Sequence, residues 1–317
     1  MQNLTLCPRE RTEGQNRHSR DNRPTGLLLI CFLLLMLGSL LFYYTGFSKE
    51  LEGMGTMDWQ RWTLRATGVG LPDTSLPRPA QKENALERAE RVVIDILMET
   101  LGRTNLTSDK TVADTLKADH LLATEVEKAI GKARRTDIRY MSDLSVEVDA
   151  EIDLIGPVLG LLIPQTGGGE PVTADTTRCP LCGQPWPSDR PFPKELFPLE
   201  VSKAQTYTGL IIDARGSGLQ PAIAPKVLNE QNQQVYGPAF VERKYAISRG
   251  IVGYMRDLEG ALRSKRVGDK PLVIKALRVS GPKRTDVVIP NAQALVLHNI
   301  KKNLSFLRQS KVIMVID

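Results

Sequence analysis

The sequence predicts an α+β protein in which one N-terminal transmembrane helix precedes two small modules of helices packed on antiparallel sheets. A single uncharged run spans residues 26–47, and segments with helical spacing of apolar residues then alternate with segments of period two. A Pro/Gly-rich stretch separates two such groups. The hydrophobic fraction of 41% and the charged fraction of 25% are typical of globular chains, which excludes wholesale disorder.

The uncharged run, "GLLLICFLLLMLGSLLFYYTGF", has 22 residues. As a helix it would rise about 33 Å, enough to cross the hydrocarbon core of a bilayer. It is longer than the apolar core of a signal peptide and is not followed by an A-x-A-like cleavage site, so we expect an uncleaved anchor. Residues 1–25 carry five Arg and no Lys, which predicts a basic cytoplasmic tail. The rest of the chain is then expected in the periplasm, tethered to the inner membrane.

Residues 56–163 are predicted to form the membrane-proximal α+β domain. Residues 56–71 favour a short hairpin or strand, and residues 81–101 repeat apolar side chains at helical spacing until Gly102. A capping box at Thr111–Asp114 predicts a second helix that runs to about Ile130 and ends at Gly131. From residue 138 to residue 154 the period becomes two, which indicates an antiparallel strand pair with a turn at residues 142–143. We interpret its acidic row as a solvated sheet face rather than a catalytic set: Glu147, Asp149, Glu151 and Asp153.

This order of segments resembles a known family over about residues 56–160. The similarity lies in "DW…RATGVG", "QKENALERAERVVIDILMETLGRTNL", "TVADTL", "EKAIGKAR" and "SVEVDAEIDL". Together they resemble the FlgP/FlgT-like family of flagellar-assembly and outer-membrane lipoprotein domains. The resemblance implies a small α+β domain with a structural role and no catalytic residues. The segment "YTGLIIDARGSGLQPAIAPKVL" is similar to the C-terminal module of uncharacterised exported bacterial proteins, which implies no activity.

Residues 164–200 are predicted to be a linker because prolines and glycines recur throughout them. Cys179 and Cys182 form a C-x-x-C pair inside it and are the candidate metal ligands. No second exported cysteine pair completes a zinc site, and Gly183 excludes c-type haem attachment. A local disulfide, unpaired thiols, a zinc ion shared between two chains and redox chemistry all remain open.

Residues 201–317 are predicted to form the distal α+β domain. We expect a strand in "YTGLIIDARG", two short strands across a polar turn at residues 226–237, and a partly helical segment from Val241. Further strands are expected in "KPLVIKALRVSG" and "TDVVIPNA", followed by one amphipathic helix, "AQALVLHNIKKNLSFL". The final "KVIMVID" should be a central, buried strand.

No nucleotide-binding, hydrolase or metalloprotease motif occurs in the chain, so we expect neither an enzyme nor a small-molecule substrate. Asp213 and Arg215 are the most tempting polar pair, and we interpret them as a structural ion pair; a hydrolase that uses Asp213 is the weaker alternative. His120 and His298 are expected to be surface or core residues. From Lys265 to Asp317, eleven Lys or Arg stand against three Asp, a local charge of +8. This basic stretch favours an anionic surface but, with Phe306 as its only aromatic residue, disfavours nucleic acid.

The sequence therefore predicts a non-enzymatic scaffold of the bacterial envelope, held by one membrane pass and acting on an envelope partner or on copies of itself. The rival hypothesis is a metal- or redox-handling envelope protein that works through Cys179 and Cys182.

Overall fold

The computed structural model describes residues 55–173, 177, 179, 184–191, 206–298 and 301–317. Residues 51–317 form one compact unit. The mixed α+β class is confirmed by the helices and by the antiparallel, parallel and mixed sheets of this unit. The predicted transmembrane span at residues 26–47 lies outside the described residues. Among the residues described, none of the helices combines the length and apolar character needed to cross a bilayer.

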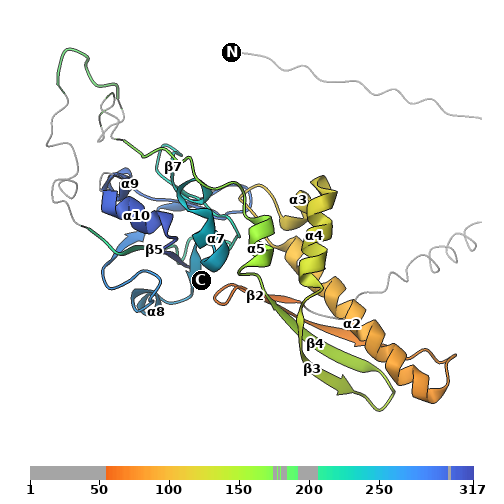
Figure 1. The fold of residues 1–317 in the computed structure, drawn as a ribbon. Helices are drawn as coiled ribbons and strands as arrows, with labels where there is room; N and C mark the ends of the chain where they lie inside the picture. Colours follow the sequence, from red (N-terminus) through yellow and green to blue (C-terminus); the bar gives the residue numbers. More distant parts are fainter. Residues whose placement is uncertain (1–54, 174–176, 178, 180–183, 192–205, 299–300) are drawn as a thin grey trace, which may run out of the picture. The chain divides into compact units, whose positions relative to one another are not determined.

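The first sheet is antiparallel and has the strand order β1-β2-β4-β3 (Figure 1). Its strands are β1 (Thr56–Asp58), β2 (Thr63–Gly70), β3 (Arg134–Tyr140) and β4 (Val146–Asp153). The predicted hairpin at residues 56–71 and the strand pair around the turn at residues 142–143 are thereby confirmed. Along β4, Val146, Val148 and Ala150 are buried, and the acidic residues between them point to the other face.

The helix α2 (Arg78–Arg103) packs along β2 and β4 (Figure 1). Its buried stripe follows the predicted helical spacing: Ala85, Ala89, Val93, Ile96, Leu97 and Leu101. The helix does not end at Gly102. It continues to Arg103, and Thr104 is the first residue with an extended backbone.

The predicted second helix is two helices, α3 (Val112–Ala118) and α4 (His120–Ile130). Thr111 and Asp114 form the predicted capping box at the start of α3. The prediction of one continuous helix was wrong at Asp119, whose extended backbone interrupts it. The Asp119 side chain then accepts the Leu122 N–H at 3.0 Å and caps α4. Gly131 ends α4 as expected.

The second sheet has the order β8-β12-β5-β9, and all three of its pairings are parallel. Its strands are β5 (Gly209–Asp213), β8 (Gly253–Met255), β9 (Pro271–Lys275) and β12 (Val312–Val315). The expectation of antiparallel sheets was wrong here. The two central strands are apolar on both faces, as parallel strands covered on both sides are. The prediction that the last strand is central and buried is confirmed, because β12 lies between β8 and β5.

The third sheet is mixed and has the order β10-β11-β6-β7. Its strands are β6 (Val227–Leu228), β7 (Gln234–Tyr236), β10 (Arg278–Ser280) and β11 (Asp286–Val288). The remaining helices are α5 (Pro157–Leu162), the short η2 (Pro238–Phe240), α7 (Arg243–Arg249), α8 (Leu258–Leu262), α9 (Asn291–His298) and α10 (Lys301–Arg308). Where the sequence predicts one helix at residues 292–307, the structure describes α9 and α10.

Hydrogen bonds join the two halves of the compact unit. The connection between α2 and α3 accepts backbone hydrogen bonds from the other half, Ile223 N–H to Asn105 O at 2.9 Å and Ala224 N–H to Leu106 O at 2.8 Å. The Gly156 N–H similarly donates to Ile247 O at 2.9 Å. One cluster of buried apolar side chains includes residues of both halves, for example Leu64 of the first and Tyr254 of the second. This cluster therefore spans both halves, while a second, smaller cluster of Ile211, Ala261, Val267, Ile313 and Val315 covers the other face of the parallel sheet.

Candidate functional site

Asp213, the carboxylate of the alternative hydrolase hypothesis, lies at the carboxyl edge of the parallel sheet. It is the last residue of β5, and its side chain is 13% exposed. Arg215 donates two hydrogen bonds to this carboxylate, from Nε to Oδ1 at 2.8 Å and from Nη2 to Oδ2 at 3.0 Å. The Lys275 Nζ lies 3.3 Å from Oδ2 and also donates to Arg215 O at 2.9 Å. The predicted Asp213–Arg215 ion pair is therefore present, and Lys275 extends it.

This arrangement fixes the charge of Asp213. The Arg215 guanidinium, and after it Lys275, hold the pKa of the carboxyl well below its usual range, against the opposing effect of burial. A general base or acid needs a pKa near the working pH, so a carboxylate this strongly stabilised in its charged form is poorly suited to proton transfer. The geometry is that of a structural clamp on the sheet edge.

His298 is a core residue that ties part of the linker to the C-terminal half. Its Nδ1 accepts the Val172 N–H at 2.6 Å, and its Nε2 lies 2.7 Å from Val235 O. These partners assign the neutral ring with the proton on Nε2. Burial lowers the pKa of His298, which keeps the ring neutral. His120, by contrast, is exposed on α4, so the two histidines are not brought together.

A pocket of about 420 Å³ lies where the glycine-rich start of the predicted linker crosses η2 and α10. Gly167 and Gly169 donate their N–H groups to Pro238 O and Ala239 O at 3.1 and 2.9 Å. A Cβ at Gly169 would meet the Phe240 ring at 2.9 Å, so only glycine permits this close crossing.

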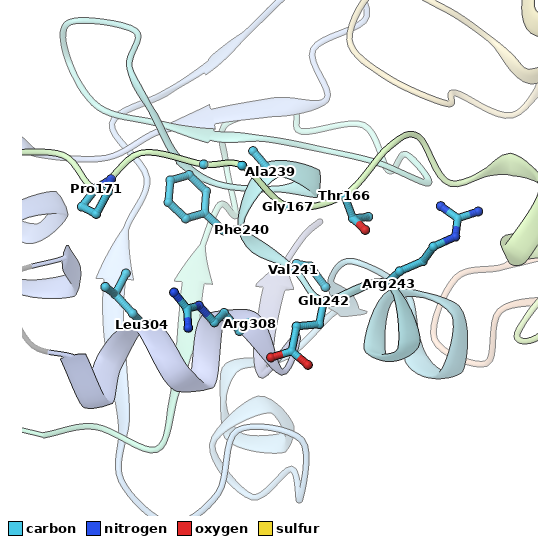
Figure 2. Close-up of a pocket in the computed structure, with 12 residues that line it drawn as sticks. Thr166, Gly167, Pro171, Ala239, Phe240, Val241, Glu242, Arg243, Leu304 and Arg308 are labelled. Atoms are coloured by element: carbon cyan, nitrogen blue, oxygen red, sulfur yellow. The ribbon is translucent and has the colours of Figure 1, made fainter.

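Figure 2 shows the charged side chains of this pocket. Glu242 and Arg308 lie below Phe240, while Arg243 points away from the others. Arg243 donates to Gly160 O at 2.7 Å, and Glu242 pairs with Lys244 at 3.0 Å. Arg308 makes no ion pair with any residue that the structure describes. A single guanidinium beside apolar side chains does not indicate a particular chemical reaction.

The acidic row of β4 is bonded to neighbouring strands. Arg139 on β3 contacts Glu147 and Asp149, at 2.9 and 2.6 Å. Glu151 pairs with Arg65 at 3.2 Å and also with Arg134. These cross-strand pairs agree with the interpretation of a solvated sheet face.

Of the two cysteines, the structure describes Cys179. The Cys179 N–H donates to Gln184 O at 2.8 Å. Cys182 lies outside the described residues, so the pair stays a prediction. Within the described ranges, no group of three or more His, Cys, Asp and Glu side chains could hold a metal ion.

The basic stretch at residues 265–317 presents fewer free charges than its composition suggests. Arg266 directs its guanidinium inward to backbone and hydroxyl acceptors of residues 249, 250 and 310. Lys275 is occupied by Asp213, and the Arg284 Nη2 donates to Ser217 O at 2.8 Å. Sequence reasoning missed these uses because each acceptor lies far along the chain or on backbone atoms, which leave no pattern.

Comparison with known proteins bears on the C-terminal half. Residues 209–317 match a family model described as the second domain of Treponema pallidum Tp0624. The match begins at β5 and contains both the parallel and the mixed sheet. A search among curated proteins gives no match to the chain.

Proposed function

We propose that this chain is a non-enzymatic scaffold of the bacterial cell envelope. Residues 26–47 anchor it in the inner membrane, residues 1–25 stay in the cytoplasm, and the compact unit works in the periplasm. Flagellar assembly is the context that the FlgP/FlgT-like resemblance of residues 56–160 supplies. The match of residues 209–317 to a domain of another protein supports a module that is reused in different chains.

One observation carries the proposal. Asp213, the carboxylate best placed for chemistry at the carboxyl edge of a parallel sheet, is held charged by Arg215 and Lys275. Its bonds stabilise the fold and make this carboxylate a poor proton acceptor for a substrate. The outer strands β3 and β9 are edges at which a partner strand or a second copy could pair.

The test is genetic complementation by two variants of the full chain. A scaffold should keep its membrane location and function in Asp213→Asn, at a loss of about 1–2 kcal/mol of stability. It should also keep them in the Cys179→Ser/Cys182→Ser double variant. Complete loss of function in a folded Asp213→Asn protein would instead indicate a hydrolase. Loss in the double variant alone would indicate metal or thiol chemistry.

Topology needs a separate measurement. Protease added to intact spheroplasts is expected to degrade residues 56–317 and to spare a fragment that contains the N-terminal tail. Full protection of the C-terminal half would contradict the periplasmic placement.

A further inference from the structure

A groove opens at the carboxyl edge of the parallel sheet, beside the strand ends of β8 and β12. Its main cavity measures about 480 Å³, within the usual range for small-ligand sites. Four separate segments build it: the β1–β2 turn, the loop at residues 218–221 and the strand ends at residues 254–256 and at residues 316–317. Ligands of open parallel sheets bind at this edge, so the position itself favours a site.

Trp59 forms the aromatic wall of the groove. Its ring packs edge-on against Trp62 and Tyr254, with centroids 5.5 and 5.3 Å away. Tyr254 is fixed in turn, because its hydroxyl donates to Ala222 O and accepts the Ala222 N–H, both at 2.9 Å. Asp58 holds the turn by accepting the Gln60 N–H at 3.0 Å. Trp59 is therefore a partly exposed ring on a rigid support.

Trp59 lines two neighbouring cavities. A second cavity of about 480 Å³ shares Trp59, Gln220 and Pro221 with the first and continues toward Thr100 and Asn105. The two cavities therefore lie next to each other, with Trp59, Gln220 and Pro221 lining both. An extended ligand of several units can therefore contact the ring while it occupies both cavities.

The polar lining determines the chemistry of the ligand. Hydrogen-bonding side chains of both polarities surround Trp59 in the first cavity: Asp58, Gln60, Gln220, Arg256 and Asp317. The Arg256 guanidinium is exposed and makes no hydrogen bond or ion pair with any residue that the structure describes. Arg103 lines the second cavity, so the charged side chains around Trp59 are two carboxylates and two guanidiniums; their formal charges cancel, which favours a ligand without net charge.

We propose that this groove binds a neutral oligosaccharide, with one sugar ring stacked on Trp59. The C–H face of a sugar suits an aromatic ring, and vicinal hydroxyls both donate to carboxylates and accept from Arg and Gln. A neutral polyol can hydrogen-bond to both kinds of charged group in the lining, whereas an acidic ligand faces Asp58 and Asp317 and a cationic ligand faces Arg103 and Arg256. The inference goes beyond the scaffold role and does not depend on where the chain is located.

The test is calorimetric titration of the full chain in a zwitterionic detergent whose headgroup carries no sugar. The probes are chitotriose, cellotriose and maltotriose, with trigalacturonic acid as the acidic comparison. At least one neutral trisaccharide should bind with a Kd below about 1 mM, and Trp59→Ala should weaken it at least about tenfold.

Because Trp59 also packs in the fold, Arg256→Ala provides a second test at an exposed residue, with an expected loss of about three- to tenfold. Arg263→Ala is the matched control; Arg263 is an exposed residue directly after α8 and pairs with Glu259 at 3.4 Å. Failure of all three neutral probes to bind at about 10 mM would overturn the proposal. So would binding that both variants leave unchanged, or a preference for the acidic trisaccharide.

Discussion

Arg266 shows how one side chain organises the C-terminal half. Its Nε donates to Ser310 O at 2.9 Å, and its two Nη atoms donate to Arg249 O, Gly250 O and the Ser310 hydroxyl at 2.6–2.9 Å. Burial of this guanidinium lowers the pKa of Arg266 to about 10, so it stays charged at neutral pH. Among the described residues its acceptors are three backbone carbonyls and one hydroxyl, so oriented neutral dipoles stabilise the charge.

Replacement of Arg266 by Lys is expected to be strongly destabilising. An ammonium group on a single stem cannot reach four acceptors that a planar fork spans, so at least one enclosed acceptor loses its donor. We expect Arg266→Lys to lower the free energy of unfolding by about 2–4 kcal/mol in urea titrations. The exposed Arg263→Lys should change it by less than about 0.5 kcal/mol. Equal midpoints for the two variants would show that the network is dispensable.

His298 makes stability depend on pH. Its folded pKa is depressed by burial, so the unfolded chain takes up a proton before the native chain does. The contribution of this residue is present in full above the usual pKa of 6.5 and is lost as pH falls through the lower folded value. In His298→Gln, the decline of the urea midpoint between about pH 7 and pH 5 should be shallower than in the parent chain. His120→Gln, on the exposed helix α4, should leave the slope unchanged.

At the scale of elements, α2 and β2 approach each other so closely that only glycine fits between them. A Cβ at Gly70 would lie 1.9 Å from Ala85 O and 2.5 Å from Ala89 N. Gly68 faces the next turn of the helix in the same way, 2.5 Å from Ala89 O. The pairing of glycines on the strand with alanines on the helix sets the distance between this sheet and its covering helix.

Two glycine substitutions test this contact. Gly70→Ala should destabilise the chain by about 3 kcal/mol, because rigid backbone atoms of α2 must move. Gly131→Ala is the matched control at the end of α4, where the backbone is helical and the nearest atom is 3.4 Å from the new Cβ. It should be neutral or stabilise by about 0.5 kcal/mol. A thermal scan that ranks the two variants in the opposite order would refute the close-contact argument.

At the scale of the whole molecule, the two halves of the compact unit are linked by backbone hydrogen bonds and share one apolar core. Trp62 illustrates the coupling: its ring packs against Tyr254 and lies 2.6 Å from the position of a Cβ on Gly250. The predicted linker contributes too, since Val172 is buried and bonded to His298.

This coupling predicts cooperative unfolding. Calorimetry of the full chain should show one transition for the compact unit, with calorimetric and van't Hoff enthalpies that agree. Two separate transitions would mean that residues 56–163 and 201–317 are thermodynamically independent. In a urea titration, tryptophan fluorescence and far-ultraviolet circular dichroism should likewise give the same unfolding midpoint.

Local periodicity and capping residues are enough to predict the α+β class, β structure at residues 56–71, the capping box at Thr111, the strand pair around residue 143 and the buried last strand. The ion pair of Asp213 and Arg215 is also predictable, because the two residues are neighbours in the chain. The parallel pairing of β5, β8, β9 and β12 is not predictable in this way, since strand direction depends on crossovers between distant segments. The inward turn of Arg266, the bond between Val172 and His298 and the groove around Trp59 have the same origin. Each joins groups that lie far apart along the chain, and no local pattern of residue types records such a meeting.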